Sequence, residues 1–322
     1  MRNYISYFFV TLKGMAMGAA DVVPGVSGGT IAFISGIYEE LITTIDKLSF
    51  KIIPLARKQG IAIAWKEYNL SFLLALGAGI LISILSFARI ITYLLENEPT
   101  LLWSFFFGLV IASILYIGGQ IKDWNWKAIV TLVLGGIASY YITVAEPSTS
   151  PDSYLFLLLS GFIAIIAMIL PGISGSFILL LLGSYEAVIS SVNMLTTAIF
   201  TVDTELGITA VSRLGVFAIG AVVGLKVFSK VLTWMFDNYK NMTLTLLTGF
   251  MIGSLNKIWP WKETVTTYLN SDNEEVPLLE KSIWPGDFAG DPQILAAIIS
   301  CIVGFLTIFL LEKLANRKKG KI

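Results

Sequence analysis

Apolar stretches of membrane-spanning length recur along the chain and are separated by short polar segments. Six of them predict spans at about 70–95, 101–118, 127–145, 211–236, 242–258 and 294–312. Each is long enough to cross, as a helix, a hydrocarbon core that is about 30 Å thick. Soluble proteins are typically about 45–50% apolar and about 25% charged, whereas this chain is 56% hydrophobic and 14% charged. We therefore expect an all-α polytopic membrane protein.

Two further apolar regions, residues 4–45 and 153–190, are each interrupted by a Pro-Gly-x-Ser-Gly sequence. The segment Pro24–Ile42 aligns without gaps on Pro171–Ile189, and nine of the 19 aligned positions are identical. A second gapless alignment pairs 83–114 with 224–255. Because internal similarity of this kind indicates duplication, we divide the chain into a first repeat, residues 1–148, and a second repeat, residues 149–322.

The placement of lysine and arginine predicts how the repeats are oriented, since basic loops stay in the cytoplasm. Asp46–Tyr68 carries five basic residues and the tail 317–321 carries four, so both are expected inside. Ser190–Thr209 contains acids but no base, and it is expected outside together with the loop 259–293. Each half then consists of one re-entrant or returning hairpin and three transmembrane helices. An odd number of crossings inverts the second half, as in many transporters, and leaves both termini cytoplasmic.

The two interrupted hairpins, 4–45 and 153–190, are the first candidates for chemistry. Proline and glycine interrupt a helix, and irregular backbone at membrane depth is tolerated only inside protein or beside a polar cavity. The helices that restart there present free N–H groups, which favour a phosphate or carboxylate. An alternative is that the glycines only permit close helix packing. The predicted phosphate-binding residues of the two breaks are Gly25, Ser27, Gly28, Gly29, Thr30, Gly172, Ser174, Gly175 and Ser176.

Charged residues within or near the spans are the second set of candidates, because such residues are costly and usually functional. Asp21 precedes the first break, and Glu39 and Glu186 are aligned across the repeat. Each could carry a coupling proton or be an interfacial carboxylate. Arg89 and Lys230 are also aligned, near opposite ends of their spans. They suit phosphate capture at the two entrances, or they extend to the interface along their aliphatic stems.

Several function classes are disfavoured by residues that the chain lacks. It has no histidine and one cysteine, which excludes zinc sites built on those residues and Ser-His-Asp catalysis. Gly25–Gly29 fits the pattern of a nucleophile elbow, but no histidine can serve as its base. No phosphate-binding loop for ATP and no basic tract for nucleic acid is present. We expect a transporter, gradient-driven or passive, with no catalytic residue, metal or cofactor.

The first break and its flanks resemble a known signature. Gly18–Thr30, followed by Gly36–Glu39, is similar to the motif of the bacterial PopT family, formerly a membrane family of unknown function. This resemblance implies a flippase of the bacterial plasma membrane that returns undecaprenyl phosphate from the outer to the cytoplasmic leaflet for peptidoglycan and other cell-envelope synthesis. It would work by alternating access at the paired hairpin tips, among membrane lipids, with protons as a candidate coupling ion and possible homo-oligomers. The alternative is a gradient-driven transporter of a small soluble anion.

Overall fold

The computed structural model describes residues 4–316, except 24–25, 149–150, 152 and 270–274. The described part is mostly helical, which confirms the expectation of a helical polytopic membrane protein. In the described residues, α6, α7, α8 and α12 are each long and apolar enough to cross a membrane, and the bent pair α10 and α11 adds a fifth span if it is counted as one. The helices are α1 (Tyr4–Asp21), α2 (Gly28–Ile34), α3 (Tyr38–Lys47), α4 (Ile52–Gln59), α5 (Ile61–Glu67), α6 (Leu70–Asn97), α7 (Pro99–Gly118), α8 (Trp126–Val144), α9 (Tyr154–Ile169), α10 (Gly175–Leu181), α11 (Tyr185–Thr201), α12 (Thr204–Ser254) and α13 (Ile294–Asn316).

Both interrupted regions fold as a helix, a break, a short helix and a third helix. The short helices α2 and α10, and the starts of α3 and α11, lie at positions that the sequence alignment pairs. Gly36 and Gly183, which are also paired, have φ of 70° and 66° and turn the chain between the two helices. Only glycine adopts this left-handed conformation without strain. The aligned segments therefore share one local structure, while the inversion of the two halves across the membrane stays a prediction.

Helix pairs in close contact build the molecule around the hairpins. Helix α12 packs on α8 and α9, α13 packs on α7, and α1 packs on α6. Gly108 of α7 lies against the backbone of α13, and Gly304 of α13 lies against that of α7, so close that neither position has room for a Cβ. Small residues at helix interfaces allow such approach in membranes, where dispersion contacts rather than water drive association.

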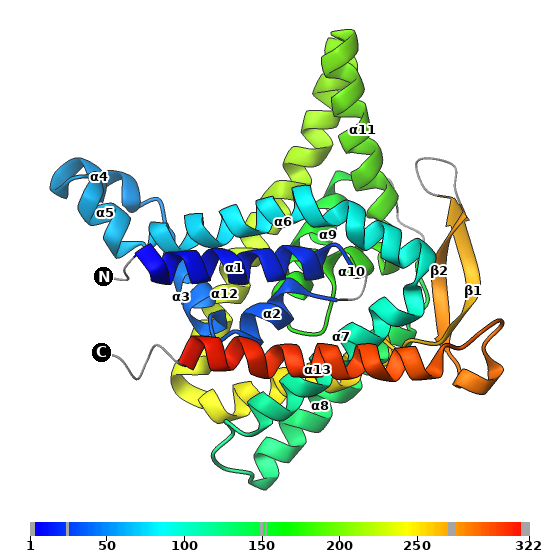
Figure 1. The fold of residues 1–322 in the computed structure, drawn as a ribbon. Coiled ribbons are helices and arrows are strands. Elements are labelled where there is room, and N and C mark those ends of the chain that lie inside the picture. Colours follow the sequence, from blue (N-terminus) through cyan, green and yellow to red (C-terminus); the bar gives the residue numbers. More distant parts are fainter. Residues whose placement is uncertain (1–3, 24–25, 149–150, 152, 270–274, 317–322) are drawn as a thin grey trace.

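Two opposite ends of the molecule are evident in Figure 1. The start of α1 and the end of α13 lie at the same end as α4 and α5, and the strands β1 and β2 lie at the other end. Helix α11 and the first part of α12 project from the remaining helices. The segment 190–209, expected as a loop outside the membrane, is instead largely helical, because α11 continues to Thr201 and the Asp203 carboxylate caps α12.

The region 259–293 contains the described strands, which the sequence did not predict. β1 (Lys262–Leu269) and β2 (Glu275–Ser282) form an antiparallel pair in which Lys262 is opposite Ser282. The β-branched residues of β1 favour a strand, so the segment expected as a loop contains a strand pair within an otherwise helical protein. The predicted spans 211–236 and 242–258 both belong to α12, which is interrupted at Tyr239 with φ −138° and ψ 43°.

Two lysines donate hydrogen bonds to the backbone of the first hairpin. The Lys13 ammonium donates to the Ser35 carbonyl, 2.5 Å away, just after α2. The Lys226 ammonium of α12 donates to the carbonyls of Ile45, Asp46 and Leu48 at the end of α3, at 3.0, 2.6 and 2.5 Å. Carbonyls at a helix end lack some of the partners that they would have within the helix, and these two lysines donate to them.

Candidate functional site

The two breaks, far apart in the sequence, lie in direct contact. The Ser27 hydroxyl of the first break donates to the carbonyls of Met168 and Leu170, at 3.0 and 3.4 Å. The Thr30 hydroxyl oxygen, from the same break, accepts a hydrogen bond from the backbone N–H of Gly172, at 2.8 Å. Ser27 and Thr30 are almost completely buried. The contact is therefore a buried polar junction between the hairpins, in which hydroxyls of the first break pair with backbone groups at the second.

The first break is capped by the protein itself. The Asp21 carboxylate accepts a hydrogen bond from the N–H of Gly28, at 2.6 Å, and the Ser27 hydroxyl accepts one from Gly29, at 3.1 Å. A Cβ at position 28 would lie 2.5 Å from an oxygen of that carboxylate, so any larger residue would force the Asp21 side chain to shift. One of the N–H groups at which the sequence predicted a phosphate, that of Gly28, thus already binds a carboxylate, and that of Gly29 binds a hydroxyl. Gly25 lies outside the described residues, as does the basic tail 317–321.

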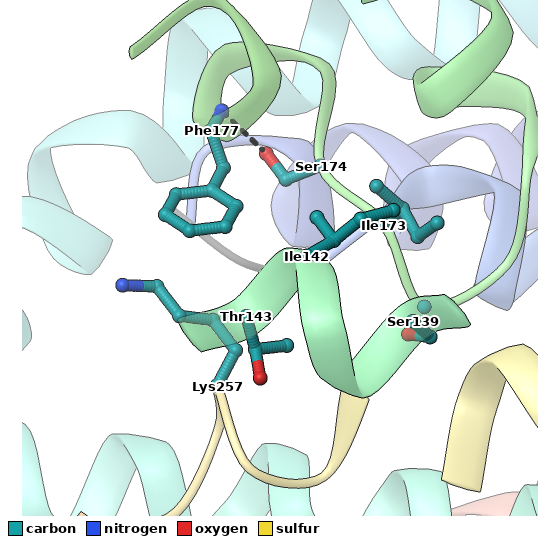
Figure 2. A pocket seen from close by; sticks show the side chains of 8 residues that line it. Ser139, Ile142, Thr143, Ile173, Ser174, Phe177 and Lys257 are labelled. Carbon is teal, nitrogen blue, oxygen red and sulfur yellow. Dashed lines mark hydrogen bonds between the residues drawn. The ribbon is translucent and has the colours of Figure 1, made fainter. Parts of the chain in front are cut away.

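The second break lines a small pocket, shown in Figure 2. In it the Ser174 hydroxyl accepts from the N–H of Phe177, at 3.5 Å, and lies 2.9 Å from the Ser176 hydroxyl. The free space holds about one water molecule, so a phosphate would fit only after lining groups move. The lining residues come from α8, the second break, α10 and the segment after α12: Ser139, Ile142, Thr143, Gly172, Ile173, Ser174, Phe177 and Lys257.

Lys257 provides the positive charge of this pocket. Its ammonium lies 4.5 Å from the centre of the Phe177 ring and 3.1 Å from the Glu280 carboxylate, and its side chain is 12% exposed. A buried cation beside hydroxyl groups is the arrangement that binds a phosphate. The sequence patterns did not single out Lys257, because it was counted only among the charges of the loop 259–293 and its flank. A base directly after an apolar span was the available signal.

A second buried lysine, Lys262 on β1, lies near the same Glu280 carboxylate as Lys257. The Lys262 ammonium lies 3.5 Å from the centre of the Trp103 ring of α7 and 3.6 Å from the Glu280 carboxylate, with a side-chain exposure of 7%. Burial lowers the pKa of Lys262 to about 7, although Glu280 opposes the shift. Burial also disfavours the charge of Glu280, but Lys262 and Lys257 outweigh it and hold the pKa of Glu280 below its ordinary value. Together they form a small buried charge cluster.

The other predicted charged residues do not gather at the junction. Arg89 and Lys230 are exposed, and neither makes a hydrogen bond or ion pair with any described residue. Glu39 is paired with Lys240 of α12 at 2.6 Å, but its side chain is 51% exposed. Glu186 is exposed at the start of α11. Of the three predicted proton carriers, Asp21 is the one that contacts a break.

Two of the break glycines also serve packing, the alternative weighed for the motif. A Cβ at Gly29 would lie 2.5 Å from the Ile169 carbonyl oxygen, across the junction between the hairpins. A Cβ at Gly175 would lie 2.9 Å from the Ala164 carbonyl oxygen of α9. The packing alternative is therefore supported at these two glycines, while phosphate binding at the motif stays a prediction.

Comparisons with known proteins find one matching family model and two similar transporters. Residues 17–276 match a family model described as "VCA0040-like: Undecaprenyl phosphate translocase-like". The chain is 43% identical, over 98% of its own length and 98% of the relative's, to a polyprenyl-phosphate transporter of Vibrio cholerae serotype O1. It is 31% identical to a polyprenyl-phosphate transporter of Staphylococcus aureus, over 77% of this chain and 85% of the relative. No solved structure matches the chain.

Proposed function

Since the chain belongs to the undecaprenyl phosphate translocase-like family, we propose that it moves undecaprenyl phosphate from the outer to the cytoplasmic leaflet of the bacterial plasma membrane. It is a multi-pass transporter of a lipid phosphate and not an enzyme. The lipid divides into an apolar chain, which is stable in the bilayer, and a charged phosphate, which is not. The protein therefore has to provide a path for the phosphate alone.

The observation that carries this proposal is the ammonium of Lys257 at the pocket beside the second break. The Ser174 and Thr143 side chains line the same pocket, and hydroxyls and an ammonium are donors that a phosphate accepts. The pocket adjoins the loop 259–293, which is expected outside the membrane. Capture from the outer leaflet is therefore the direction that this placement favours.

We place the phosphate path along the junction between the breaks. Ser27 and Thr30 line it from the first hairpin, and Gly172 and Ser174 line it from the second. In the structure the path is closed, because Asp21 covers the first break and the pocket at the second holds about one water molecule. Transport by alternating access requires these internal contacts to give way first on one face and then on the other.

Asp21 is the carboxylate that we assign to proton coupling. When it is ionised, it competes with phosphate for the N–H of Gly28, and protonation would weaken that hydrogen bond and release the site. Glu39 and Glu186 are exposed and make no contact with the breaks. Coupling through Asp21 thus needs no relay, since the group that would bind the proton already blocks the anion position.

A reconstituted assay tests the function. The full chain is placed in vesicles that contain undecaprenyl phosphate, and the lipid exposed on each leaflet is measured with and without a pH gradient. We expect protein-dependent transbilayer movement, which Lys257→Gln lowers at least about tenfold because a charged hydrogen-bond donor is lost. Lys281→Gln serves as the matched control, because Lys281 is an exposed lysine on β2.

Two outcomes would contradict the proposal. One is movement of undecaprenyl phosphate no faster than in protein-free vesicles. The other is uptake of inorganic phosphate by the same vesicles without movement of the lipid, which would instead favour a transporter of a small soluble anion. If Asp21→Asn keeps the response of the wild type to the pH gradient, the assignment of coupling to Asp21 is wrong, and Glu186→Gln is its control.

A further inference from the structure

Among the described residues, the charge cluster at the end of the molecule that carries the strands has two buried lysines and one carboxylate. Lys257, Lys262 and Glu280 have side-chain exposures of 12%, 7% and 21%. Both ammonium groups lie within 4 Å of the same carboxylate oxygen, at 3.1 and 3.6 Å. The second distance is too long for a hydrogen bond, and the Lys262 nitrogen is buried without a hydrogen-bond partner. Two hydrogen-bond-donating cations thus share one acceptor.

We infer that Lys257 and Lys262 form a binding site for a phosphate monoester, and that the carboxylate of Glu280 occupies this site as an internal substitute which the phosphate displaces. The inference rests on the proposed function, because it names the residues that receive the lipid phosphate from outside. Neither lysine belongs to the two breaks, and the site extends the pocket at Ser174 toward the strand pair.

The charge and the number of acceptor atoms favour phosphate over the resident carboxylate. A phosphate monoester carries a charge of about −1.5 to −2 at pH 7 and has three strong acceptor oxygens. It can therefore balance two ammonium groups and accept a hydrogen bond from each, including the one that the Lys262 nitrogen does not make in the structure. A single carboxylate that is 3.6 Å from Lys262 does neither.

Two aromatic rings keep the lysines in place when the carboxylate leaves. The Lys257 ammonium lies over Phe177 of α10 at 4.5 Å, and the Lys262 ammonium lies over Trp103 of α7 at 3.5 Å. Cation–π contacts stabilise an ammonium without occupying its hydrogen-bonding protons. The rings belong to the helical part of the protein, whereas Glu280 belongs to β2. Rotation of the Glu280 side chain away from the lysines therefore leaves both ammonium groups over their rings.

Binding of farnesyl phosphate, a short-chain polyprenyl phosphate, to the full chain in detergent micelles tests this inference. We expect Glu280→Gln to raise the affinity about tenfold, equivalent to about 1.4 kcal/mol, because the competing carboxylate is gone. Glu280→Asp keeps the negative charge but shortens the side chain by one methylene, so this variant should raise the affinity less than Glu280→Gln does. Because it is the more conservative change, it also provides a test if Glu280→Gln does not fold. Lys257→Gln and Lys262→Met should each lower the affinity about tenfold or more. The matched control is Glu263→Gln, an exposed acid on β1, which should change nothing.

The possible results separate this inference from the proposed function. If the wild type moves undecaprenyl phosphate but Glu280→Gln and Glu280→Asp both bind farnesyl phosphate like the wild type or more weakly, Glu280 is not a displaceable substitute and the inference is wrong. Equal binding of farnesol would show that the phosphate is not recognised. If inorganic phosphate competes with farnesyl phosphate at equal concentration, the site recognises free phosphate. A wild type that binds neither ligand and moves no lipid contradicts the proposed function itself.

Discussion

At the scale of single residues, the hydroxyls of the breaks have a structural role that precedes any role in transport. Thr30 accepts the N–H of Gly172, and Ser27 donates to two carbonyls before the second break. A buried backbone group without a partner costs free energy comparable to a lost hydrogen bond. The sequence made these hydroxyls candidates as phosphate ligands, and it contained no indication that they pair with the backbone at the second break.

Thr30→Val tests the structural role of this hydroxyl. Valine keeps the shape but removes the acceptor, so the buried N–H of Gly172 becomes unpaired, which should cost about 1–3 kcal/mol. We expect a lower midpoint of thermal unfolding in detergent, whereas Thr30→Ser, which keeps the acceptor, should stay close to the wild type. Equal midpoints for the valine and serine variants would show that the contact does not stabilise the junction.

The lowered pKa of Lys262 leads us to expect that the contact between the strand pair and α7 depends on pH. Its pKa is about 7 when buried, against 10.5 when exposed, so burial disfavours the protonated form. The free-energy cost of burying Lys262 against α7 is therefore largest below pH 7. It falls as the pH rises from 7 toward 10.5, because the buried lysine then releases its proton. Protection of 262–269 against hydrogen exchange, corrected for the intrinsic rate, should increase over that window. Lys262→Met should remove the increase; a variant that keeps it would assign the effect to another group.

At the scale of elements, the short helices α2 and α10 bring the two breaks together. Their position follows from local sequence, since Pro-Gly ends one helix, a serine begins the next and a glycine with positive φ ends it. For this reason the hairpins could be predicted from Pro24, Ser27 and Gly36 and their aligned partners. The contact between the hairpins depends on the close approach of Gly29 to the Ile169 carbonyl. These two residues are separated in the sequence by almost the length of one repeat, so local sequence patterns do not reveal their contact.

Gly29→Ala tests that contact. The added methyl would meet the Ile169 carbonyl oxygen at 2.5 Å, and such overpacking typically costs about 1–3 kcal/mol. We expect a lower thermal midpoint and slower transport. The same substitution at Gly77, which has no atom within 4 Å of the new methyl group, is the control and should not lower stability. Wild-type behaviour of Gly29→Ala would mean that the hairpins separate without cost.

The strand pair shows where sequence patterns failed at this scale. Residues 259–293 are charged enough to be interpreted as a loop. Their lysines were used only to predict which side of the membrane this loop is on. What makes Lys257 and Lys262 notable is their burial against Phe177 and Trp103. Those partners come from distant parts of the sequence, and only the folded chain brings them to one place.

At the scale of the whole molecule, the charge pattern predicts that 46–68 and the loop 259–293 lie on opposite sides of the membrane. Helix α4 lies at one end and the strand pair at the other. In a Cys301→Ser background, the variant Lys58→Cys should react with an impermeant thiol reagent from the cytoplasmic side alone. The variant Lys281→Cys should react from the outside alone. Labelling of both from the same side would contradict the orientation, and with it the assignment of the Lys257 pocket to the outer leaflet.

The central claim is that the lipid phosphate binds beside the second break. It is tested most directly by a structure of the full chain in lipid nanodiscs with undecaprenyl phosphate. We predict phosphate density within hydrogen-bond distance of Lys257 and Ser174, with the Glu280 carboxylate withdrawn from the 3.1 Å contact that it makes here. Phosphate bound at Arg89 or Lys230, with Lys257 and Glu280 still paired, would contradict the account.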